Sequence, residues 1–546
     1  MASLRLWLAG GLALLAVAPG RAGPAGGPDD LAARIDRHIA AGWAKAGVTP
    51  APAADDAEFV RRVYLDLAGR IPHVTEVRDF LKDKAPDKRA RLVEKLLGGP
   101  RYVTHFVNVW RSLLLPEATA SIQTRILAPG FEAWLRKQLA GNVRYDVMVR
   151  DLLTAPVGPQ SMQNIYGAGG QGEPTPVAFY LAKENKPENL AAATSRLFLG
   201  FKLECAQCHN HPFADWKRDQ FWGYAAFFAG LQSRRQGDFA QPGREIPDRR
   251  EVTIPGTEKV VQAAFPNGKA PKWKEKTSAR QTLAEWMTAR DNPYFARAAV
   301  NRVWAYFLGT GLIDPVDEMV GSEHAPSHPE LLDELARAFA AHDFDLKFLI
   351  RAITASQAYQ RTSAGKGEVE PHLFARMPLR GLSPEQLYDS VAMATGYQEN
   401  GNRLPPGVVV KFGNNGSARA EFLTRFANQS EKATEVQTSI LQALSLMNGS
   451  LIATATDLKN SATLAGVLDA PFMDTKARVK ALYLASLTRQ PKPKELDRLV
   501  KYVEAGGAAA DEAPAETDEE KEMRYNNALA DVFWALLNSG EFFLNH

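Results

Sequence analysis

The only two cysteines of this 546-residue chain lie three positions apart, in the segment Cys205-Ala206-Gln207-Cys208-His209. A CxxC pair followed directly by histidine is the attachment pattern of a c-type haem. Two thiols one helical turn apart can reach the two vinyl groups of one porphyrin, and the adjacent imidazole can ligate the iron. The segment therefore predicts haem c bound through Cys205 and Cys208, with His209 as the proximal ligand.

The same side chains permit two other kinds of site. One is a zinc site, whose ligands would be Cys205, Cys208, His209 and His211. Structural zinc usually takes its ligands from two separated pairs, however, and the sequence has no second CxxC. The other is a disulfide or redox pair. A thioredoxin-like CxxC opens a helix after a strand, whereas this one follows a predicted helix over Pro187–Leu199.

An aromatic run follows the cysteine segment, and it either walls a haem pocket or belongs to the ordinary core. Its members are Phe213, Trp216, Phe221, Trp222, Tyr224, Phe227 and Phe228. His211 is too near His209 in sequence to be the opposite axial ligand, because the chain would have to cross the porphyrin plane. The sequence does not select a second axial ligand among the methionines and the other histidines, so five-coordinate iron stays open.

Other patterns carry less chemical meaning. The glycines of Gly167–Gly172 match GxGxxG, but no hydrophobic strand precedes them and prolines follow them, which indicates a loop. His324 and His328 have the spacing of a metal pair on a helix. Nearby prolines interrupt such a helix, and Ser327 and Glu330 instead predict a capping box. The P-loop, HExxH and GxSxG patterns are absent, so the sequence identifies no catalytic pair.

The first 22 residues have the pattern of a secretory signal peptide. Met1–Arg5 carries one positive charge, Leu6–Ala18 is apolar, and Gly20-Arg21-Ala22 is the predicted cleavage site. No later segment is long and apolar enough to predict a membrane span. We therefore expect a periplasmic or extracellular protein, a location that suits covalent haem attachment.

Charge and apolar periodicity indicate a globular, mainly α-helical chain. The formal net charge of +3 is nearly balanced and gives no reason to expect nucleic-acid binding. One helix is predicted over Asp56–Leu67, with its apolar face formed by Phe59, Val60, Val63, Tyr64 and Leu67. Other predicted helices cover 77–82, 88–97, 103–114, 131–140, 145–154, 279–289, 296–308, 329–341 and 346–356, and Ser383 is expected to cap a further one.

Two helical domains are predicted, with a small β insert between them. Glu251–Ile254 and Lys259–Gln262 flank Pro255-Gly256 and predict a β-hairpin. The expected organisation is therefore a leader over residues 1–22, a helical domain over 30–235 that carries the cysteine segment, a β-rich linker over 236–275 and a helical domain over 276–546.

A short internal repeat has one copy in each of the two predicted helical domains. The segment Arg62–Pro72 resembles Ala481–Pro491, and each predicts a helix that ends in Arg-x-Pro before an acidic amphipathic helix. Two copies do not make a solenoid. Duplication and convergent helix–loop–helix packing both explain the similarity.

Longer motifs resemble a known pair of domains of unknown function that is typical of large exported planctomycete proteins. The segments Tyr64–Pro72 and Leu199–Phe213, the latter containing CAQCHNHPF, resemble the first domain. Asn292–Trp304, with the sequence NPYFARAAVNRVW, resembles its usual companion. Gly311–Asp317 and Leu441–Gly449 continue that match, so the resemblance covers nearly all of the chain after the leader.

The resemblance implies a redox or haem setting, because members of this family are often fused to a cytochrome c-like domain. A redox protein would then be the expected partner. The family is also similar to proteins suspected of acting in polysaccharide breakdown at the cell surface. This association accompanies the alternative in which the Cys/His segment holds zinc or a disulfide in a structural or binding protein.

Overall fold

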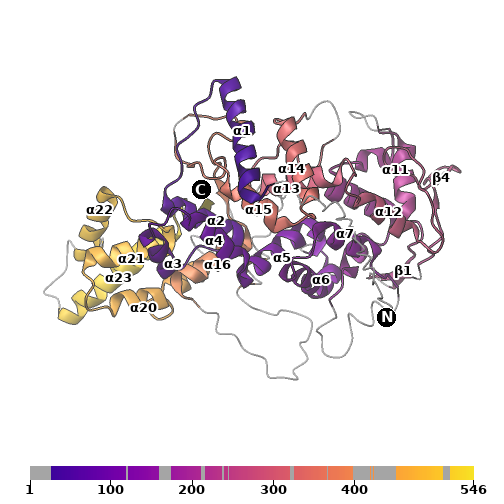
Figure 1. The fold of residues 1–546 in the computed structure, drawn as a ribbon. Helices are drawn as coiled ribbons and strands as arrows, with labels where there is room; N and C mark the ends of the chain where they lie inside the picture. Colours follow the sequence, from indigo (N-terminus) through magenta and orange to yellow (C-terminus); the bar gives the residue numbers. More distant parts are fainter. Residues whose placement is uncertain are drawn as a thin grey trace, which may run out of the picture.

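The computed structural model describes residues 26–118, 121–158, 174–210, 216–236, 239–243, 245–319, 325–365, 367–397, 419, 422–423, 450–507 and 517–546. The predicted leader, the glycine pattern at 167–172, His211, Phe213 and His324 lie outside these residues. Within them the fold is mainly α, as predicted (Figure 1).

The helices of the first half are α1 (Pro28–Ala46), α2 (Asp56–Ala68), α3 (Val74–Lys82), α4 (Lys88–Leu97), α5 (Pro100–Leu114), α6 (Ile122–Ala140), α7 (Tyr145–Thr154), α9 (Val177–Ala182), α10 (Pro187–Thr194) and α11 (Arg218–Ala225). Those of the second half are α12 (Ala279–Met287), α13 (Phe295–Leu308), α14 (Pro329–Ala341), α15 (Leu346–Ala355), α16 (Pro384–Thr395), α19 (Ser450–Thr456), α20 (Ala462–Leu468), α21 (Thr475–Leu487), α22 (Pro493–Glu504) and α23 (Asp518–Leu537).

The described strands form three two-stranded antiparallel sheets. They pair β1 (Ser233–Gln236) with β2 (Phe239–Pro242), β3 (Glu251–Thr253) with β4 (Val260–Gln262), and β5 (Arg380–Gly381) with β6 (Leu544–Asn545). The β3–β4 pair confirms the predicted hairpin, with Val252 opposite Val261. The β5–β6 pair brings the end of the chain back to its middle.

The helix α2 illustrates how local sequence sets an element. Asp55 caps its start by accepting a hydrogen bond from the Glu58 amide at 2.8 Å. Gly69 ends it in the left-handed conformation, with φ of 68°. The predicted apolar face lies in the largest hydrophobic core, whereas Leu65, from the same helix, lies in a second core. One helix therefore contributes to both cores.

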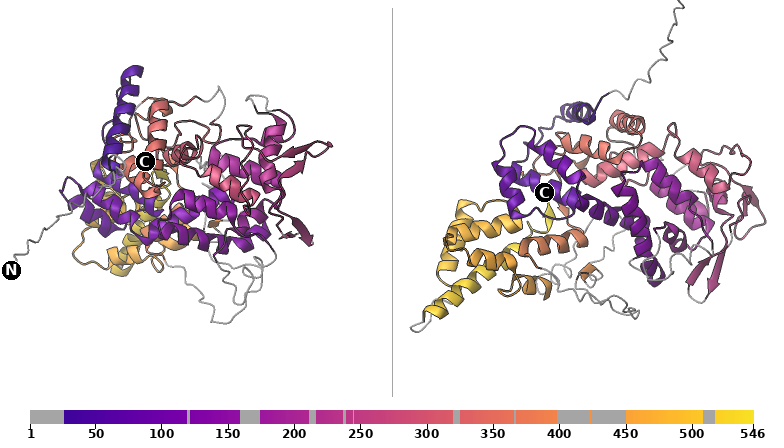
Figure 2. Two further views of the ribbon diagram at one scale, coloured as in Figure 1. Left: turned by 45° about the vertical axis from the view of Figure 1, so that its right-hand side comes forward. Right: turned by 60° about the horizontal axis from the view of Figure 1, so that its bottom comes forward.

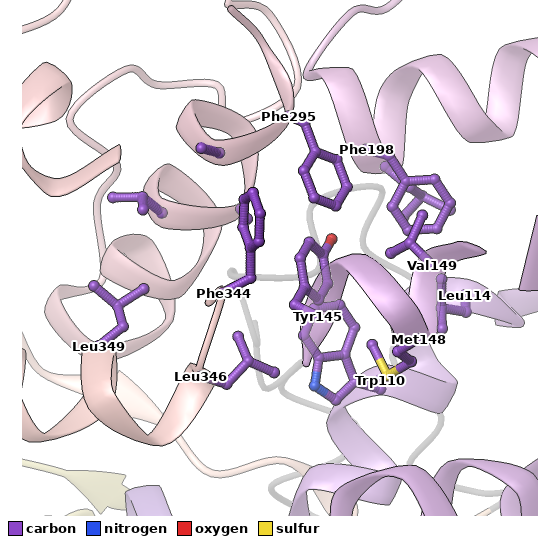
Figure 3. Close-up of a cluster of buried hydrophobic side chains, with 14 of the residues drawn as sticks. Trp110, Leu114, Tyr145, Met148, Val149, Phe198, Phe295, Phe344, Leu346 and Leu349 are labelled. Atoms are coloured by element: carbon purple, nitrogen blue, oxygen red, sulfur yellow. The ribbon is translucent and has the colours of Figure 1, made fainter. Parts of the chain in front are cut away.

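The larger core spans the β-rich segment. Its buried side chains run from Leu31 to Met377 and come from α1–α7 and α9–α15. Figure 3 shows a part of it where Trp110 and Tyr145 lie beside Phe295 and Phe344. The second core gathers α16 and α19–α23 at one end of the molecule, opposite the end with α11, α12, β1 and β4 (Figures 1 and 2).

Both copies of the internal repeat adopt the same helix–turn–helix structure. Helix α21, like α2, starts after a capping aspartate, Asp474, and ends at a residue in the left-handed conformation, Thr488, with φ of 65°. Arg70 lies over the Tyr64 ring at 5.7 Å, and Arg489 lies over the Tyr483 ring at 5.3 Å. The repeat is thus present in capping and side-chain contacts as well as in sequence.

The ion pairs that follow each arginine also correspond. Arg70 pairs with Glu76 at 3.4 Å, and Arg489 pairs with Glu495 at 2.9 Å. Each glutamate also accepts a hydrogen bond from the backbone amide that precedes the second helix of its copy. These shared contacts are what both duplication and convergent packing predict.

The described helices include none that is both long and apolar enough to span a bilayer.

Candidate functional site

The cysteine segment follows a helix, as predicted, but the end of that helix is irregular. The regular α-helix α10 ends at Thr194, and a π-helix, η2 (Ser195–Leu199), follows it directly. Gly200, with φ of 73°, ends η2. A short 3₁₀ turn, η3 (Glu204–Gln207), then begins beside the first cysteine. The two cysteines therefore stand on a tight turn rather than at the start of a helix.

The middle of this turn is fixed, whereas its two thiols face solvent. Ala206 is fully buried, and the Gln207 carbonyl accepts hydrogen bonds from Trp222 Nε1 at 3.0 Å and Arg218 Nε at 3.3 Å. Cys205 and Cys208 are both exposed and have free thiols. Cysteine is otherwise among the most buried residue types. A held backbone with two accessible sulfurs suits attachment of a group that docks from outside.

His209 is exposed, and among the described residues its ring has a hydrogen bond at Nδ1 alone. Its Nδ1 lies 2.7 Å from the Asn210 carbonyl oxygen. Since a carbonyl can only accept, Nδ1 carries a proton in this contact, and in the neutral form of the ring the lone pair is on Nε2. An imidazole held through Nδ1–H to a backbone carbonyl is the usual arrangement of a metal-ligating histidine.

Residues from beyond the hairpin hold the approach to the turn. The Met319 amide donates to the Gly200 carbonyl at 2.9 Å, and Lys202 pairs with Glu318 at 3.4 Å. Met319 also packs so closely that a Cβ on Gly200 would lie 2.4 Å from Met319 Sδ. The positive φ of Gly200 and this contact therefore both favour glycine at this position.

The described members of the aromatic run belong to the core. Phe221, Trp222, Tyr224, Phe227 and Phe228 are each at most 2% exposed, and Trp216 is partly buried against the same core. Trp222 links this core to the cysteine turn through its indole N–H. Sequence reasoning missed that link, and it also missed Arg218, because no spacing rule joins either residue to Gln207.

The second histidine pattern has a structural role that differs from the predicted one. His328, not Ser327, occupies the N-cap position of α14, with no side-chain capping hydrogen bond. The predicted capping box is therefore wrong. Ser327 is used elsewhere, since its hydroxyl donates to the Leu312 carbonyl at 3.2 Å.

The described residues fit a covalently held haem in the chemistry of their donor atoms. Cys205 and Cys208 offer two sulfurs at the spacing of the attachment pattern, and His209 offers Nε2. Zinc would need further ligands, and of the predicted set His211 is outside the described residues. Within the described part of the chain, no three His, Cys, Asp or Glu side chains are grouped as a metal site.

Two family models match the chain, in the predicted order. The first model, described as a protein of unknown function (DUF1549, PSCyt2), matches residues 34–233, which include the cysteine turn. The second, described as a protein of unknown function (DUF1553, PSD1), matches residues 279–503. Searches of curated proteins and of solved structures gave no match. The chain therefore belongs to the proteins that pair these two domains of unknown function.

Proposed function

We propose that this protein is an exported c-type haem protein with an electron-transfer or haem-dependent redox role at the cell envelope. The observation that carries the proposal is the cysteine turn, where two free, exposed thiols stand beside an exposed histidine whose Nδ1 is held by the Asn210 carbonyl. The leader pattern supports a periplasmic or extracellular location, where such attachment takes place. The partner in this role would be a second redox protein.

Each side chain of the turn has a distinct part in this proposal. Cys205 and Cys208 would hold the porphyrin edge through two thioether bonds, and His209 would hold the iron through Nε2. The Asn210 carbonyl keeps the imidazole in the required tautomer, and the Gln207 carbonyl keeps the backbone in place. A bound haem c would supply reversible one-electron chemistry.

The competing proposal is a structural or binding protein in which the same thiols hold zinc or form a disulfide, in connection with surface polysaccharides. It shares the accessible sulfurs and the Nε2 of His209, and it adds His211 as a ligand. The two proposals differ in mass, colour and metal content, so one preparation can separate them.

The decisive experiment produces the full chain together with a cytochrome c maturation system. We expect the purified protein to have a haem-sized mass increment and a pyridine haemochrome spectrum of c type. Zinc by elemental analysis without that increment, or a mass deficit of two hydrogen atoms without haem or metal, would overturn the haem proposal in favour of zinc or a disulfide.

Substitutions within the motif provide matched controls. Cys205→Ser and Cys208→Ser should each remove one thioether and shift the haemochrome band, and the double variant should lose covalent haem. Gln207→Ala alters the motif but keeps both sulfurs and the backbone carbonyl that Trp222 and Arg218 bind. It should therefore retain the full haem content.

A further inference from the structure

We infer that the two family-matched segments fold as one unit. In this unit, residues 34–233 form a surface that binds the second segment, residues 279–503. The boundary between the two family models, at residues 234–278, falls inside one hydrophobic core that extends to Met377. This inference is independent of what the cysteine turn binds. It concerns which parts of the chain must be present for that turn to exist.

Tyr145 shows the apolar side of this surface (Figure 3). Its ring, 1% exposed, stacks on Phe295 of the second segment at 5.1 Å between centroids and also contacts Phe339 at 6.2 Å. Its amide donates to the Phe344 carbonyl at 3.1 Å. Without the second segment, Tyr145 would keep its ring contact with Trp110, at 5.5 Å, but would lose those with Phe295 and Phe339.

Arg280 of the second segment forms hydrogen bonds with polar groups of this surface. Its guanidinium, 4% exposed, donates to the Leu153 and Ala155 carbonyls and to the Tyr180 hydroxyl, each at 3.0 Å. All three acceptors belong to the first segment, and Arg280 belongs to the second. The Leu153 carbonyl also accepts from the Tyr180 hydroxyl at 2.8 Å, so it is the Ala155 carbonyl whose described hydrogen bond comes from this arginine of the second segment.

The cysteine turn is positioned by the same partner. Phe201, four residues before the first cysteine, meets the Tyr294 ring edge-on at 4.6 Å. Arg302 donates to the Arg196 carbonyl at 3.2 Å, within the π-helix that leads to the turn. Together with Met319 on Gly200, these contacts hold the approach to the turn from the second segment.

The dependence also runs in the opposite direction. Leu65 and Ile71 of the first segment are fully buried in the second core. Arg61 donates to the Ser486 carbonyl at 3.0 Å, and the Ile71 amide donates to the Ser390 hydroxyl at 3.2 Å. Each segment therefore completes the core of the other, and neither is a self-standing domain.

A cut in the folded full chain tests this inference. Gly256 lies in the exposed turn between β3 and β4, where an added Cβ would meet nothing within 4 Å, so a protease site can be inserted after it. We expect the two pieces to co-elute at the mass of the intact chain and to unfold in one transition. Elution as two folded pieces, or two independent transitions, would overturn the inference.

A pair of matched substitutions tests the same contact without cutting the chain. Phe295→Ala removes a fully buried ring of the second segment, whereas Phe472→Ala removes a ring of the same segment that is 82% exposed. By hydrogen–deuterium exchange, we expect α7 of the first segment to exchange at least about tenfold faster in Phe295→Ala and unchanged in Phe472→Ala. Faster exchange confined to residues 279–377 would contradict the inference.

Discussion

Arg380 donates two hydrogen bonds, of 2.9 and 3.0 Å, to the carboxylate of Asp66, although 314 positions separate the two residues in sequence. Asp66 is 1% exposed and also accepts from the Tyr359 hydroxyl at 2.8 Å and from Asn545 Nδ2 at 2.7 Å. One carboxylate thus joins α2, the segment after α15, strand β5 and strand β6. This junction lies where the two cores meet.

Replacement of Asp66 by asparagine should be strongly destabilising. The change leaves the Arg380 guanidinium, whose side chain is only 16% exposed, without its counter-charge, and the loss of a partner from a buried ion pair costs about 3–5 kcal/mol. Denaturant unfolding of the full chain measures this free energy. Asp248→Asn is the control, because its 83% exposed side chain pairs with Arg250 at the surface and should cost less than about 1 kcal/mol. Equal losses in the two variants would contradict the assigned role of Asp66.

Stability should fall as the pH drops from 6.5 to 4, partly because of His105. Burial lowers the pKa of His105 from 6.5 to about 4, although a hydrogen bond to the Asp66 backbone opposes the shift. The unfolded chain therefore binds a proton in this window that the folded chain does not. At about 1.4 kcal/mol per unit, His105 accounts for about 3 kcal/mol of lost stability, which levels off below pH 4.

The substitution His105→Gln should remove that part of the pH dependence, as measured by unfolding at pH 7 and pH 4.5. The pKa values of His328 and His546 are also lowered by burial, so some dependence of the same sign should persist. Tyr306→Phe is the control, because it deletes the hydroxyl that lies 2.6 Å from His105 Nε2 but keeps the buried ring. If His105→Gln and the parent have the same pH dependence, the assignment is wrong.

Removal of residues 541–546 should destabilise the protein through Arg61. This guanidinium donates to the Phe542 carbonyl at 2.9 Å, and burial lowers the pKa of Arg61 only to about 10, so it stays charged at pH 7. Truncation leaves that charge without its carbonyl partner and deletes strand β6. We therefore expect the free energy of unfolding to fall by about 3 kcal/mol or more. Thermal and denaturant unfolding measure it.

A double-mutant cycle isolates the contribution of Arg61 to this loss. Arg61→Met should cost clearly less free energy of unfolding in the truncated chain than in the full chain, because the truncation has already removed the carbonyls of residues 541–546 that Arg61 binds. Arg101→Met is the control, since its side chain is 49% exposed and distant in sequence from the deleted residues. Strict additivity of the Arg61 substitution and the truncation would show that the two do not interact.

Alanine at Gly200 should be far more costly than alanine at Gly256. Both glycines have positive φ, of 73° and 75°, so both substitutions carry a backbone penalty of about 1–2 kcal/mol. Only at Gly200 would the new Cβ also collide with Met319 Sδ, at 2.4 Å, whereas Gly256 faces open space. Unfolding free energies and the rates of thiol labelling at Cys205 and Cys208 should both change more for Gly200→Ala.

Local patterns predicted the elements whose causes are local. Helices α4, α7 and α14 and the β3–β4 hairpin agree with the predicted bounds, since apolar period and turn residues act over a few positions. Helix α6 was predicted only from residue 131, whereas it begins at Ile122 and contains Pro129. Packing of α6 on α5 and α9 supports this helix despite the proline.

The sequence predicted which side chains form the candidate site, but not their exposure or their hydrogen bonds. Five adjacent residues identified the two thiols and the imidazole. Their exposure, the tautomer of His209 and the bonds from Trp222 and Arg218 to Gln207 depend on tertiary contacts that spacing does not encode. The same holds for Asp66, whose partners Arg380 and Asn545 come from distant parts of the chain.

The internal repeat has a genealogical consequence. Where the first copy has Arg61, Arg62 and Asp66, the second copy has Lys480, Ala481 and Ala485 at the corresponding positions. If the two copies arose by duplication, one helix–turn–helix unit gave rise to two copies with different roles. The first copy carries the charges that bind the end of the chain, and the second is an ordinary packing element of a single core.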